Sequence, residues 1–345
     1  MNDSCLLDIY GYRALVTCAC PEALAGIRED FAFFAKGAAA DVISDAVRID
    51  LLDADPPYAE VPDVAANVFT PRNVSYRSGD LTFVDYSGAA LGIHDRKRGG
   101  FRVFSRNCDL LYEAAYLFLL AQSGEYLDAR RLHRVHALGV SVQNCAALVL
   151  LPMGGGKSTL GSELLRYPEI RLLSDDSPLI DGGGKVWAFP LRLGLMPGSE
   201  GNIPRDKFRT IQRMEFGPKL LVNHSYFADR VAAQADAGLL LLGTRSLSNT
   251  CEITPASKMA ALRAMLGNCV VGMGLFQGME FVFQRGWAEV FRKSMAALLR
   301  LRASLRLIAK SEIYHVVLGR DIEQNGRAVM EKLRERANKT ASTEL

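Results

Sequence analysis

The 345-residue chain is organised around Leu151-Pro152-Met153-Gly154-Gly155-Gly156-Lys157-Ser158-Thr159. A short apolar run, residues 146–151, leads into it and is long enough for one buried strand. The residues after it, 160–165, have the pattern of a helix. A strand, a glycine-rich loop and a helix that begins at Lys-Ser are the context of a phosphate-binding P-loop. The stretch therefore predicts a site for nucleotide phosphates.

The residue types in this loop suit phosphate for physical reasons. Glycines let backbone N–H groups converge on one point without Cβ clashes, and the start of the following helix adds the positive end of its dipole. Lys157 is expected to reach the β- and γ-phosphates, and the Ser158 hydroxyl to ligate Mg²⁺. The predicted ATP-binding residues are Met153, Gly154, Gly155, Gly156, Lys157, Ser158 and Thr159.

Composition limits the class of protein. Hydrophobic residues make up 49% of the chain and charged residues 23%, which is typical of a globular protein. The length predicts one large domain or two modest ones. A net charge of +3 is too small a basic excess to indicate nucleic-acid binding, so no nucleic-acid partner is expected.

The cysteines and the N-terminus bear on the compartment. The seven cysteines are scattered and show no metal-binding spacing, and Cys18 and Cys20 are interpreted as ordinary buried or edge thiols. Residues 1–4 lack the basic segment that opens a signal peptide, and apolar runs such as residues 117–120 are too short to span a bilayer. We therefore expect a cytoplasmic protein without a membrane partner.

Hydrophobic periodicity divides the chain into two regions. Residues 1–106 are predicted to form a small α+β region of unknown role, and residues 107–345 an ATP-binding catalytic domain. In the first region the charged residues 94–100 are interpreted as a solvated hairpin tip. The expected elements are strands at 13–18, 45–53, 81–86, 101–104, 138–142, 146–151, 170–174, 237–242 and 314–318, and helices at 22–35, 109–122, 255–266, 289–310 and 321–338, with a frayed tail at 339–345.

Two carboxylates and one histidine add chemistry to the loop. Asp175 and Asp176 end the strand at 170–174, eighteen residues after Lys157. Such a pair can hold Mg²⁺ and accept a proton from an incoming hydroxyl. His136 precedes a strand pair that leads into the loop, and it gains interest only from the glycine loop and the two aspartates that come after it in the chain.

These residues and spacings resemble the catalytic domain of HPr kinase/phosphorylase, which shares its core with phosphoenolpyruvate carboxykinase. The matching stretches are 136–140, the loop through Gly156-Lys157-Ser158, Glu163, and 172–176. The resemblance covers about residues 125–320 and implies an α/β fold with mixed α+β sheets. It also implies ATP and Mg²⁺, with the metal near Ser158, Asp175 and Asp176.

The resemblance further implies roles and partners. One of Asp175 and Asp176 would be the base toward an acceptor hydroxyl and the other would serve the metal, but the sequence does not say which. His136 would line the transfer site. Some divergent relatives phosphorylate a serine on a peptide precursor, including lasso peptide precursors, so a peptide or small protein is the expected acceptor. The family's hexamers suggest a homo-oligomer.

The chain departs from the family pattern at three positions. Leu151 replaces the first loop glycine, Thr159 stands where the family has Glu, and Ser177 stands where it commonly has Arg. Arg192 is the candidate for a second cationic group. Two other functions fit the same residues: a kinase of a small-molecule hydroxyl, and a non-catalytic nucleotide-binding regulatory module. Acceptor choice depends on loops rather than on the phosphate cradle, so the motifs do not decide among them.

Overall fold

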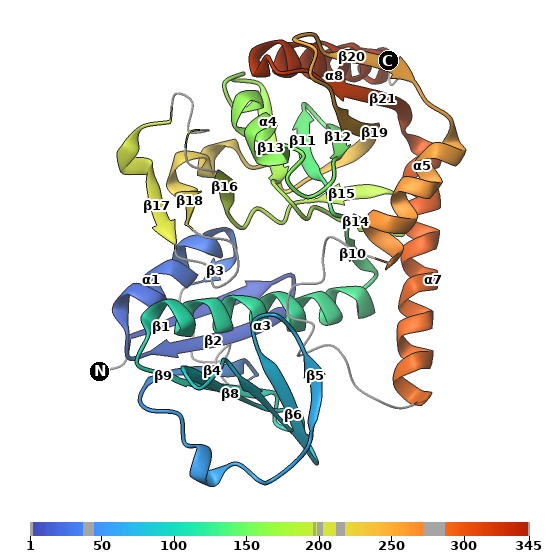
Figure 1. Ribbon diagram of the computed structural model, residues 1–345. Helices are drawn as coiled ribbons and strands as arrows, with labels where there is room; N and C mark the ends of the chain where they lie inside the picture. Colours follow the sequence, from blue (N-terminus) through green and yellow to red (C-terminus); the bar gives the residue numbers. More distant parts are fainter. Residues whose placement is uncertain are drawn as a thin grey trace. The chain divides into compact units, whose positions relative to one another are not determined.

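The computed structural model describes residues 3–36, 45–195, 198, 203–211, 218–271 and 287–343 (Figure 1). The chain divides into two compact units. The first comprises residues 1–127, 210–219 and 277–285, and the second 128–209, 220–276 and 286–345. Both units combine helices with sheets, which confirms the expected mixed α and β class. The first unit runs through Leu127 instead of stopping at residue 106, because it includes a long helix, α3.

The first unit contains a nine-stranded sheet. Its strand order is β3-β1-β2-β4-β9-β8-β7-β6-β5, and the pairs β2–β4 and β4–β9 are parallel. Strands β1, β3, β5, β6 and β8 were not predicted individually. The elements are β1 (Asp3–Ile9), β2 (Tyr12–Cys18), α1 (Pro21–Asp30), η1 (Ala32–Phe34), β3 (Ala35–Lys36), β4 (Val47–Asp53), η2 (Tyr58–Glu60), β5 (Ala66–Phe69), β6 (Val74–Ser78), β7 (Leu81–Asp85), β8 (Ala90–Asp95), β9 (Gly100–Ser105) and α3 (Cys108–Ala129).

Helix α3 forms much of the core of this unit. Its apolar residues recur around almost the whole circumference, and Phe118 and Leu119 are fully buried. Phe118 stacks on Phe101 of β9 with ring centroids 4.2 Å apart. Tyr112 donates a hydrogen bond to the buried carboxylate of Asp30 in α1. The helix is longer than the predicted 109–122 because its apolar pattern is continuous rather than one-sided.

The segment expected to be a hairpin tip contains a buried histidine. His94 and Asp95 belong to strand β8, and the turn itself is residues 96–99, held by Asp95 Oδ1, which accepts from the backbone N–H groups of Lys97 and Arg98. His94 is 5% exposed, and its ring lies edge-on to Phe118 with centroids 4.9 Å apart. The solvated-tip interpretation is therefore wrong for His94, because strand alternation directs its side chain inward.

His94 should make stability depend on pH. Burial, with a smaller contribution from Arg96, lowers its pKa from 6.5 to about 4. Between these values the unfolded chain binds a proton here and the native protein does not. Acidification from pH 6.5 to 4 is therefore expected to reduce the free energy of unfolding by up to about 3 kcal/mol through this residue. Urea unfolding of wild type and His94→Phe across that range measures it, and an equal pH dependence in both would refute the assignment.

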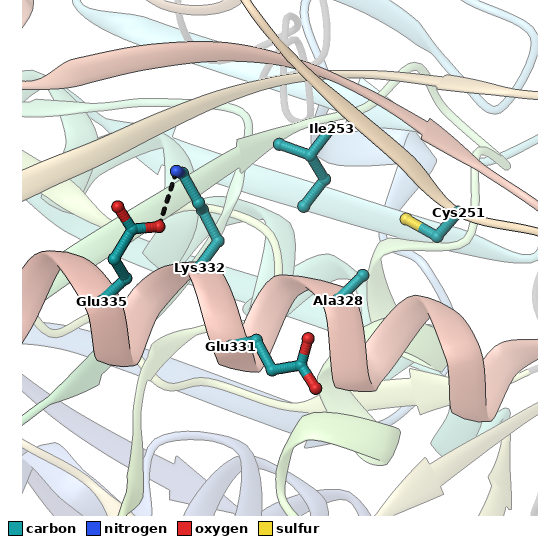
Figure 2. A pocket seen from close by; sticks show the side chains of 6 residues that line it. All are labelled: Cys251, Ile253, Ala328, Glu331, Lys332 and Glu335. Carbon is teal, nitrogen blue, oxygen red and sulfur yellow. Dashed lines mark hydrogen bonds and ion pairs between the residues drawn. The ribbon is translucent and has the colours of Figure 1, made fainter.

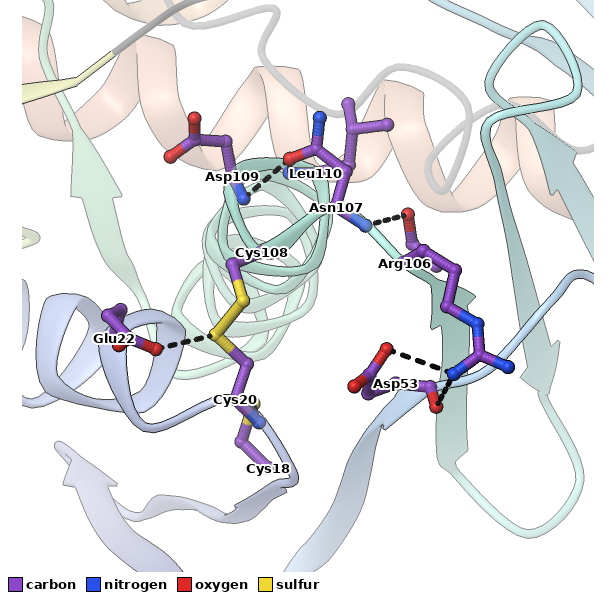
Figure 3. Close-up of a disulfide and its surroundings, with 10 residues drawn as sticks. Cys18, Cys20, Glu22, Asp53, Arg106, Asn107, Cys108, Asp109 and Leu110 are labelled. Atoms are coloured by element: carbon purple, nitrogen blue, oxygen red, sulfur yellow. Dashed lines mark hydrogen bonds and ion pairs between the residues drawn. A yellow bond between two sulfur atoms is a disulfide. The ribbon is translucent and has the colours of Figure 1, made fainter.

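A disulfide joins the start of α1 to the start of α3. Cys20 is bonded to Cys108, with Cα atoms 6.1 Å apart, and Cys18 lies beside them (Figure 3). The interpretation of Cys20 as a thiol is therefore wrong, because only the fold brings together two residues 88 positions apart. Within the described ranges, Cys20, Glu22 and Cys108 are the only group of His, Cys or acidic residues with metal-binding spacing, and two of its three ligand atoms form the disulfide.

The second unit contains the glycine loop. A mixed sheet has the order β10-β14-β15-β19-β12-β11-β13, with β21 beside β19 and β20 beside β21, and β16-β18-β17 form a small sheet. The elements from residue 128 onward are β10 (Leu132–Arg134), β11 (Leu138–Val142), β12 (Cys145–Leu150), α4 (Lys157–Leu164), β13 (Ile170–Ser174), β14 (Leu179–Asp181), β15 (Lys185–Trp187), β16 (Leu193–Leu195), η3 (Arg205–Lys207), β17 (Phe208–Ile211), β18 (Lys219–Val222), η4 (His224–Tyr226), η5 (Ala228–Arg230), β19 (Gln234–Arg245), β20 (Glu252–Pro255), α5 (Lys258–Met265), the π-helix η6 (Leu266–Val271), α7 (Trp287–Lys310), β21 (Glu312–Leu318) and α8 (Ile322–Thr343).

Strand directions gather the predicted site at one edge of this sheet. The hairpin β11–β12 is confirmed, with Val142 paired to Cys145, and β13 is also antiparallel to β11. Strands β12 and β13 therefore run the same way, and the segments after both, the glycine loop and Asp175-Asp176, leave at the same edge. The amino end of β11 is at that edge too, which brings in His136. Strand β19, parallel to β12, ends there as well.

Helices α4 and α8 cover this sheet over a continuous apolar core. Leu160 and Leu164 of α4 and Leu333 of α8 pack against alternate strand residues such as Val149 and Leu241. Helix α8 continues to Thr343, so the tail expected to fray from residue 339 is helical for most of its length. Among the helices of the described ranges, none combines the length and apolarity that crossing a membrane requires.

Candidate functional site

Each glycine of the loop is required by its geometry. Gly154 and Gly156 have φ of +72° and +94°, which side-chain-bearing residues rarely adopt. A Cβ on Gly155 would lie 2.9 Å from the Pro152 carbonyl oxygen, the same oxygen that accepts a hydrogen bond from the Gly155 N–H. The loop is therefore a tight turn of three glycines that ends at the first residue of α4.

Leu151 occupies a structural position, which explains its departure from the loop consensus. It follows the last residue of β12 and is 2% exposed. Its side chain fills the space above Gly243 of β19, where a Cβ would lie 2.5 Å from Leu151 Cδ2. Leucine here anchors the start of the loop in the core, so the turn begins one residue later, at Pro152.

Lys157 is a buried cation inside the loop. The side chain is 7% exposed, and Nζ donates hydrogen bonds to the carbonyl oxygens of Leu151 (2.9 Å) and Pro152 (3.4 Å). Nζ also lies 2.9 Å from His136 Nε2 and 3.7 Å from Asp176 Oδ1. Burial lowers the pKa of Lys157, and the nearby Asp176 and Asp175 oppose that shift. Carbonyl oxygens and one carboxylate thus hold the ammonium group at the mouth of the loop.

His136 connects the lysine to a carboxylate. Its backbone N–H donates to the Asn268 carbonyl oxygen (2.9 Å), which fixes the segment before β11. Its Nδ1 lies 3.2 Å from Asp176 Oδ1, although not in hydrogen-bond alignment. Burial lowers the pKa of His136, Asp176 raises it, and Lys157 lowers it again. Since the net shift is downward from 6.5, the ring is neutral at pH 7, and Nε2 accepts from the lysine.

Ser158 and Asp175 form a pair of oxygens beside the lysine. The Ser158 hydroxyl donates to Asp175 Oδ2 at 2.7 Å, and the Gly194 N–H approaches the same oxygen at 3.5 Å. Asp175 is 7% exposed. Adjacent ligands of an octahedral Mg²⁺, each about 2.05 Å from the metal, are about 2.9 Å apart. The hydroxyl and carboxylate oxygens are of the ligand type that Mg²⁺ takes, and in this structure they are bonded to each other.

Asp176 has a different environment from its neighbour. Its side chain is 44% exposed, whereas that of Asp175 is buried. The Asp176 carbonyl oxygen accepts from the Ala137 N–H (3.2 Å), which ties the end of β13 to the start of β11. The structure thus brings together His136, Lys157, Ser158, Asp175 and Asp176, and it separates the two carboxylates into one buried beside the serine and one open to solvent.

The remaining predicted residues lie around this cluster or outside it. Met153 is 74% exposed in the loop, and Thr159 is half-buried in the first turn of α4. Glu163 is engaged elsewhere, since it pairs with Arg166 at 3.0 Å and packs against Gly326 of α8. Arg192 is half-buried in the segment before β16, and its expected role stays a prediction.

One residue near the loop was not singled out from the sequence. Arg245 is the last residue of β19, and its Nη1 lies 3.2 Å from the position that a Cβ on Gly156 would take. In the sequence, the only indication that Arg245 could belong to the site is its position as a basic residue shortly after the apolar run 237–242. That signal becomes meaningful only when β19 is known to lie beside β12 and parallel to it.

A shallow groove of about 280 Å³ lies between β20 and α8 (Figure 2). It is lined by Cys251, Ile253, Ala328, Glu331, Lys332 and Glu335. Hydrogen bonds from Lys332 and Lys339 lower the pKa of Glu335 to about 2, so these charges are already satisfied by one another. None of the groove residues belongs to the cluster around Lys157, and the chemistry of the site is not found there.

The chain was also compared with known proteins. It matches no protein-family model, and a search of curated proteins finds no match either. The assignment of function therefore depends on the geometry described above.

Proposed function

We propose that this protein is an ATP- and Mg²⁺-dependent kinase with a P-loop core of the HPr kinase type. It would transfer the γ-phosphoryl group to a hydroxyl, that of a serine, on a peptide or small protein. The observation that carries the proposal is the arrangement at the mouth of the glycine loop. There a buried lysine, a serine–aspartate oxygen pair and a second, solvent-accessible carboxylate meet within hydrogen-bond or ion-pair distance.

The loop and its lysine serve the nucleotide in this proposal. The backbone N–H groups of Gly154 and Gly156 and the ammonium group of Lys157 would neutralise the β- and γ-phosphates, while the Gly155 N–H closes the turn onto the Pro152 carbonyl oxygen. Ser158 and Asp175 would hold Mg²⁺, which neutralises further phosphate charge. Transfer of a phosphoryl group depends mostly on positioning and charge neutralisation, and this set of residues supplies both.

We assign the base to Asp176 and the metal to Asp175. Asp175 is buried and already bonded to the metal-binding hydroxyl of Ser158, whereas Asp176 is open to an incoming acceptor. The acceptor oxygen forms a bond to the γ-phosphorus, the bond from that phosphorus to the β,γ-bridging oxygen breaks, and ADP leaves. The hydroxyl proton passes to the Asp176 carboxylate. His136, which lies beside Asp176 and Lys157, would line the transfer site.

A cytoplasmic location and self-association are parts of the same proposal. ATP-dependent transfer fits the cytosol, but disulfides are rare there. Counting free thiols in protein purified under non-reducing conditions tests whether the Cys20–Cys108 disulfide forms. The proposal expects the Cys20–Cys108 bond to be dispensable for transfer in reducing buffer, since both cysteines belong to the first unit and the cluster to the second.

Incubation with MgATP and serine-containing peptides, followed by mass spectrometry, tests the proposed reaction. The expected result is one added phosphoryl group on the peptide that requires both ATP and Mg²⁺. Matched peptides with alanine in place of serine serve as controls. ATP consumption with a small hydroxyl compound and no peptide would identify a metabolite kinase instead. Nucleotide binding without turnover against every acceptor would favour a regulatory module and contradict the kinase proposal.

A further inference from the structure

Three cysteines and one glutamate gather where two helices of the first unit begin. Cys20 is the N-cap of α1, and Cys108 is the first residue of α3. Cys18 ends β2, two residues before Cys20. Figure 3 shows the Glu22 carboxylate beside the disulfide, with Glu22 Oε2 at 3.2 Å from Cys20 Sγ. This group of side chains belongs to the first unit, whereas the proposed kinase site belongs to the second.

The ligand atoms of this group have the spacing of a metal site. Cys20 Sγ, Cys108 Sγ and a Glu22 carboxylate oxygen all lie within 4.8 Å of one another. Zn²⁺ binds sulfur at about 2.3 Å and carboxylate oxygen at about 2.0 Å, so tetrahedral ligands lie about 3.5 to 3.8 Å apart. The Cα atoms of the two cysteines are 6.1 Å apart. Rotation about the Cα–Cβ bonds can therefore bring the reduced sulfurs to the separation that zinc requires.

The surroundings of the sulfurs favour thiolates that are paired with a cation. Burial raises the pKa of the Cys18 thiol, and a hydrogen bond that Cys18 Sγ accepts from the Cys20 N–H at 3.3 Å opposes this shift. Helices α1 and α3 both begin at the group, and the positive end of a helix dipole stabilises a nearby thiolate. Since Glu22 is exposed, a metal ion can enter from solvent at the carboxylate.

The disulfide and a metal ion exclude each other, because both use the sulfurs of Cys20 and Cys108. A dithiol reductant of the cytosol converts the bond to two thiols and is itself oxidised to a disulfide. Binding of Zn²⁺ then releases a proton from each cysteine ligand to solvent. In a reducing compartment, clustered cysteines are more often metal ligands than disulfide partners.

We propose that the reduced protein binds a structural Zn²⁺ at this group. The four ligands are Cys18, Cys20, Glu22 and Cys108. In the zinc form the Cys18 side chain turns toward the ion and completes the tetrahedron, as a structural site requires four protein ligands. Thiolates are soft ligands that select Zn²⁺ over Mg²⁺ and Ca²⁺. The ion replaces the disulfide in joining the starts of α1 and α3, and the site does not depend on the proposed kinase activity.

Zinc binding to the full chain, kept reduced with a phosphine, tests the proposal. Chelator-treated protein is titrated with Zn²⁺ in competition with a chromophoric chelator. We expect one equivalent to bind with a Kd of about 10 nM or tighter. The Tm should rise by about 5 °C or more, because the ion binds the native state. Co²⁺ in place of Zn²⁺ should give a thiolate-to-metal charge-transfer band, and the oxidised protein should give none.

Variants identify the ligands. Cys20→Ser and Cys108→Ser are expected to weaken zinc binding by about 10³-fold or more, and Cys18→Ser and Glu22→Gln by about tenfold or more. Glu22→Gln changes an exposed side chain, so it tests the site even if a cysteine variant fails to fold. Cys251→Ser removes a half-buried thiol of the second unit and should bind zinc like wild type.

The contrary outcomes are distinct. If the reduced wild type binds no zinc, the proposal is wrong and the kinase proposal is unaffected. Wild-type affinity in Cys20→Ser or Cys108→Ser would place the metal elsewhere on the chain and also overturn it. Wild-type affinity in Cys18→Ser or Glu22→Gln would contradict a site of four protein ligands.

Discussion

Replacing Lys157 by methionine is expected to lower kcat/KM for phosphoryl transfer by about 10³-fold or more, equivalent to about 4 kcal/mol of transition-state stabilisation. The ammonium group is the one cation within the loop itself, held there by the Leu151 and Pro152 carbonyl oxygens. Methionine preserves the length and apolar contacts of a side chain that is 7% exposed, but it carries no charge. Initial rates of ADP formation with a saturating peptide acceptor provide the measurement.

The control for this variant is Lys339→Met, which removes a half-exposed lysine that pairs with Glu335 on α8. It should leave kcat/KM unchanged. Both variants should retain the wild-type circular dichroism spectrum. Transfer by Lys157→Met at more than a tenth of the wild-type rate would show that the lysine does not contact the transferred group, and the account of the loop would fail.

Replacing Asp176 by asparagine is expected to lower kcat by about 10²- to 10⁴-fold while the affinity for MgATP changes little. The amide cannot accept the hydroxyl proton, yet the volume of the side chain is unchanged. Asp175→Asn should behave differently, because it removes a ligand proposed for the metal. In that variant the Mg²⁺ concentration that gives half-maximal activity should rise by about tenfold or more.

This contrast between neighbouring aspartates tests the division of roles. Calorimetric MgATP affinity, Mg²⁺ titration of activity and kcat are measured for both variants, with Asp229→Asn as an exposed carboxylate control. The assignment is reversed if Asp175→Asn loses only kcat and Asp176→Asn shifts the Mg²⁺ requirement. Full activity in both would remove the carboxylates from the mechanism.

The candidate site could be predicted from the sequence because its signals are local. Two of the three glycines before Lys-Ser, Gly154 and Gly156, have backbone angles that only glycine adopts easily. The hairpin before them has a short apolar pattern on each side of Gln143-Asn144. Asp175 and Asp176 follow a strand directly. The family resemblance led us to expect these aspartates beside the glycine loop. The physical reason is that β12 and β13 run in the same direction, so the segments that follow them leave the sheet at the same end.

The features that the sequence did not reveal depend on contacts between distant segments. The Cys20–Cys108 bond and the proximity of Arg245 to Gly156 both require knowledge of which strands and helices lie side by side. His94 was misinterpreted because the charges around it dominate the pattern, although strand alternation continues through it. Leu151 departs from the motif for a packing reason that only Gly243 makes visible.

The most direct test of the central claim is a crystal structure with Mg²⁺ and a non-hydrolysable ATP analogue. The account predicts the analogue's outer phosphates within hydrogen-bond distance of Lys157 Nζ and of the N–H groups of Gly154 and Gly156. It also predicts the metal in contact with Ser158 Oγ or Asp175 Oδ2. Binding of the analogue elsewhere on the chain, with the loop and these two oxygens not in contact with it, would contradict the claim.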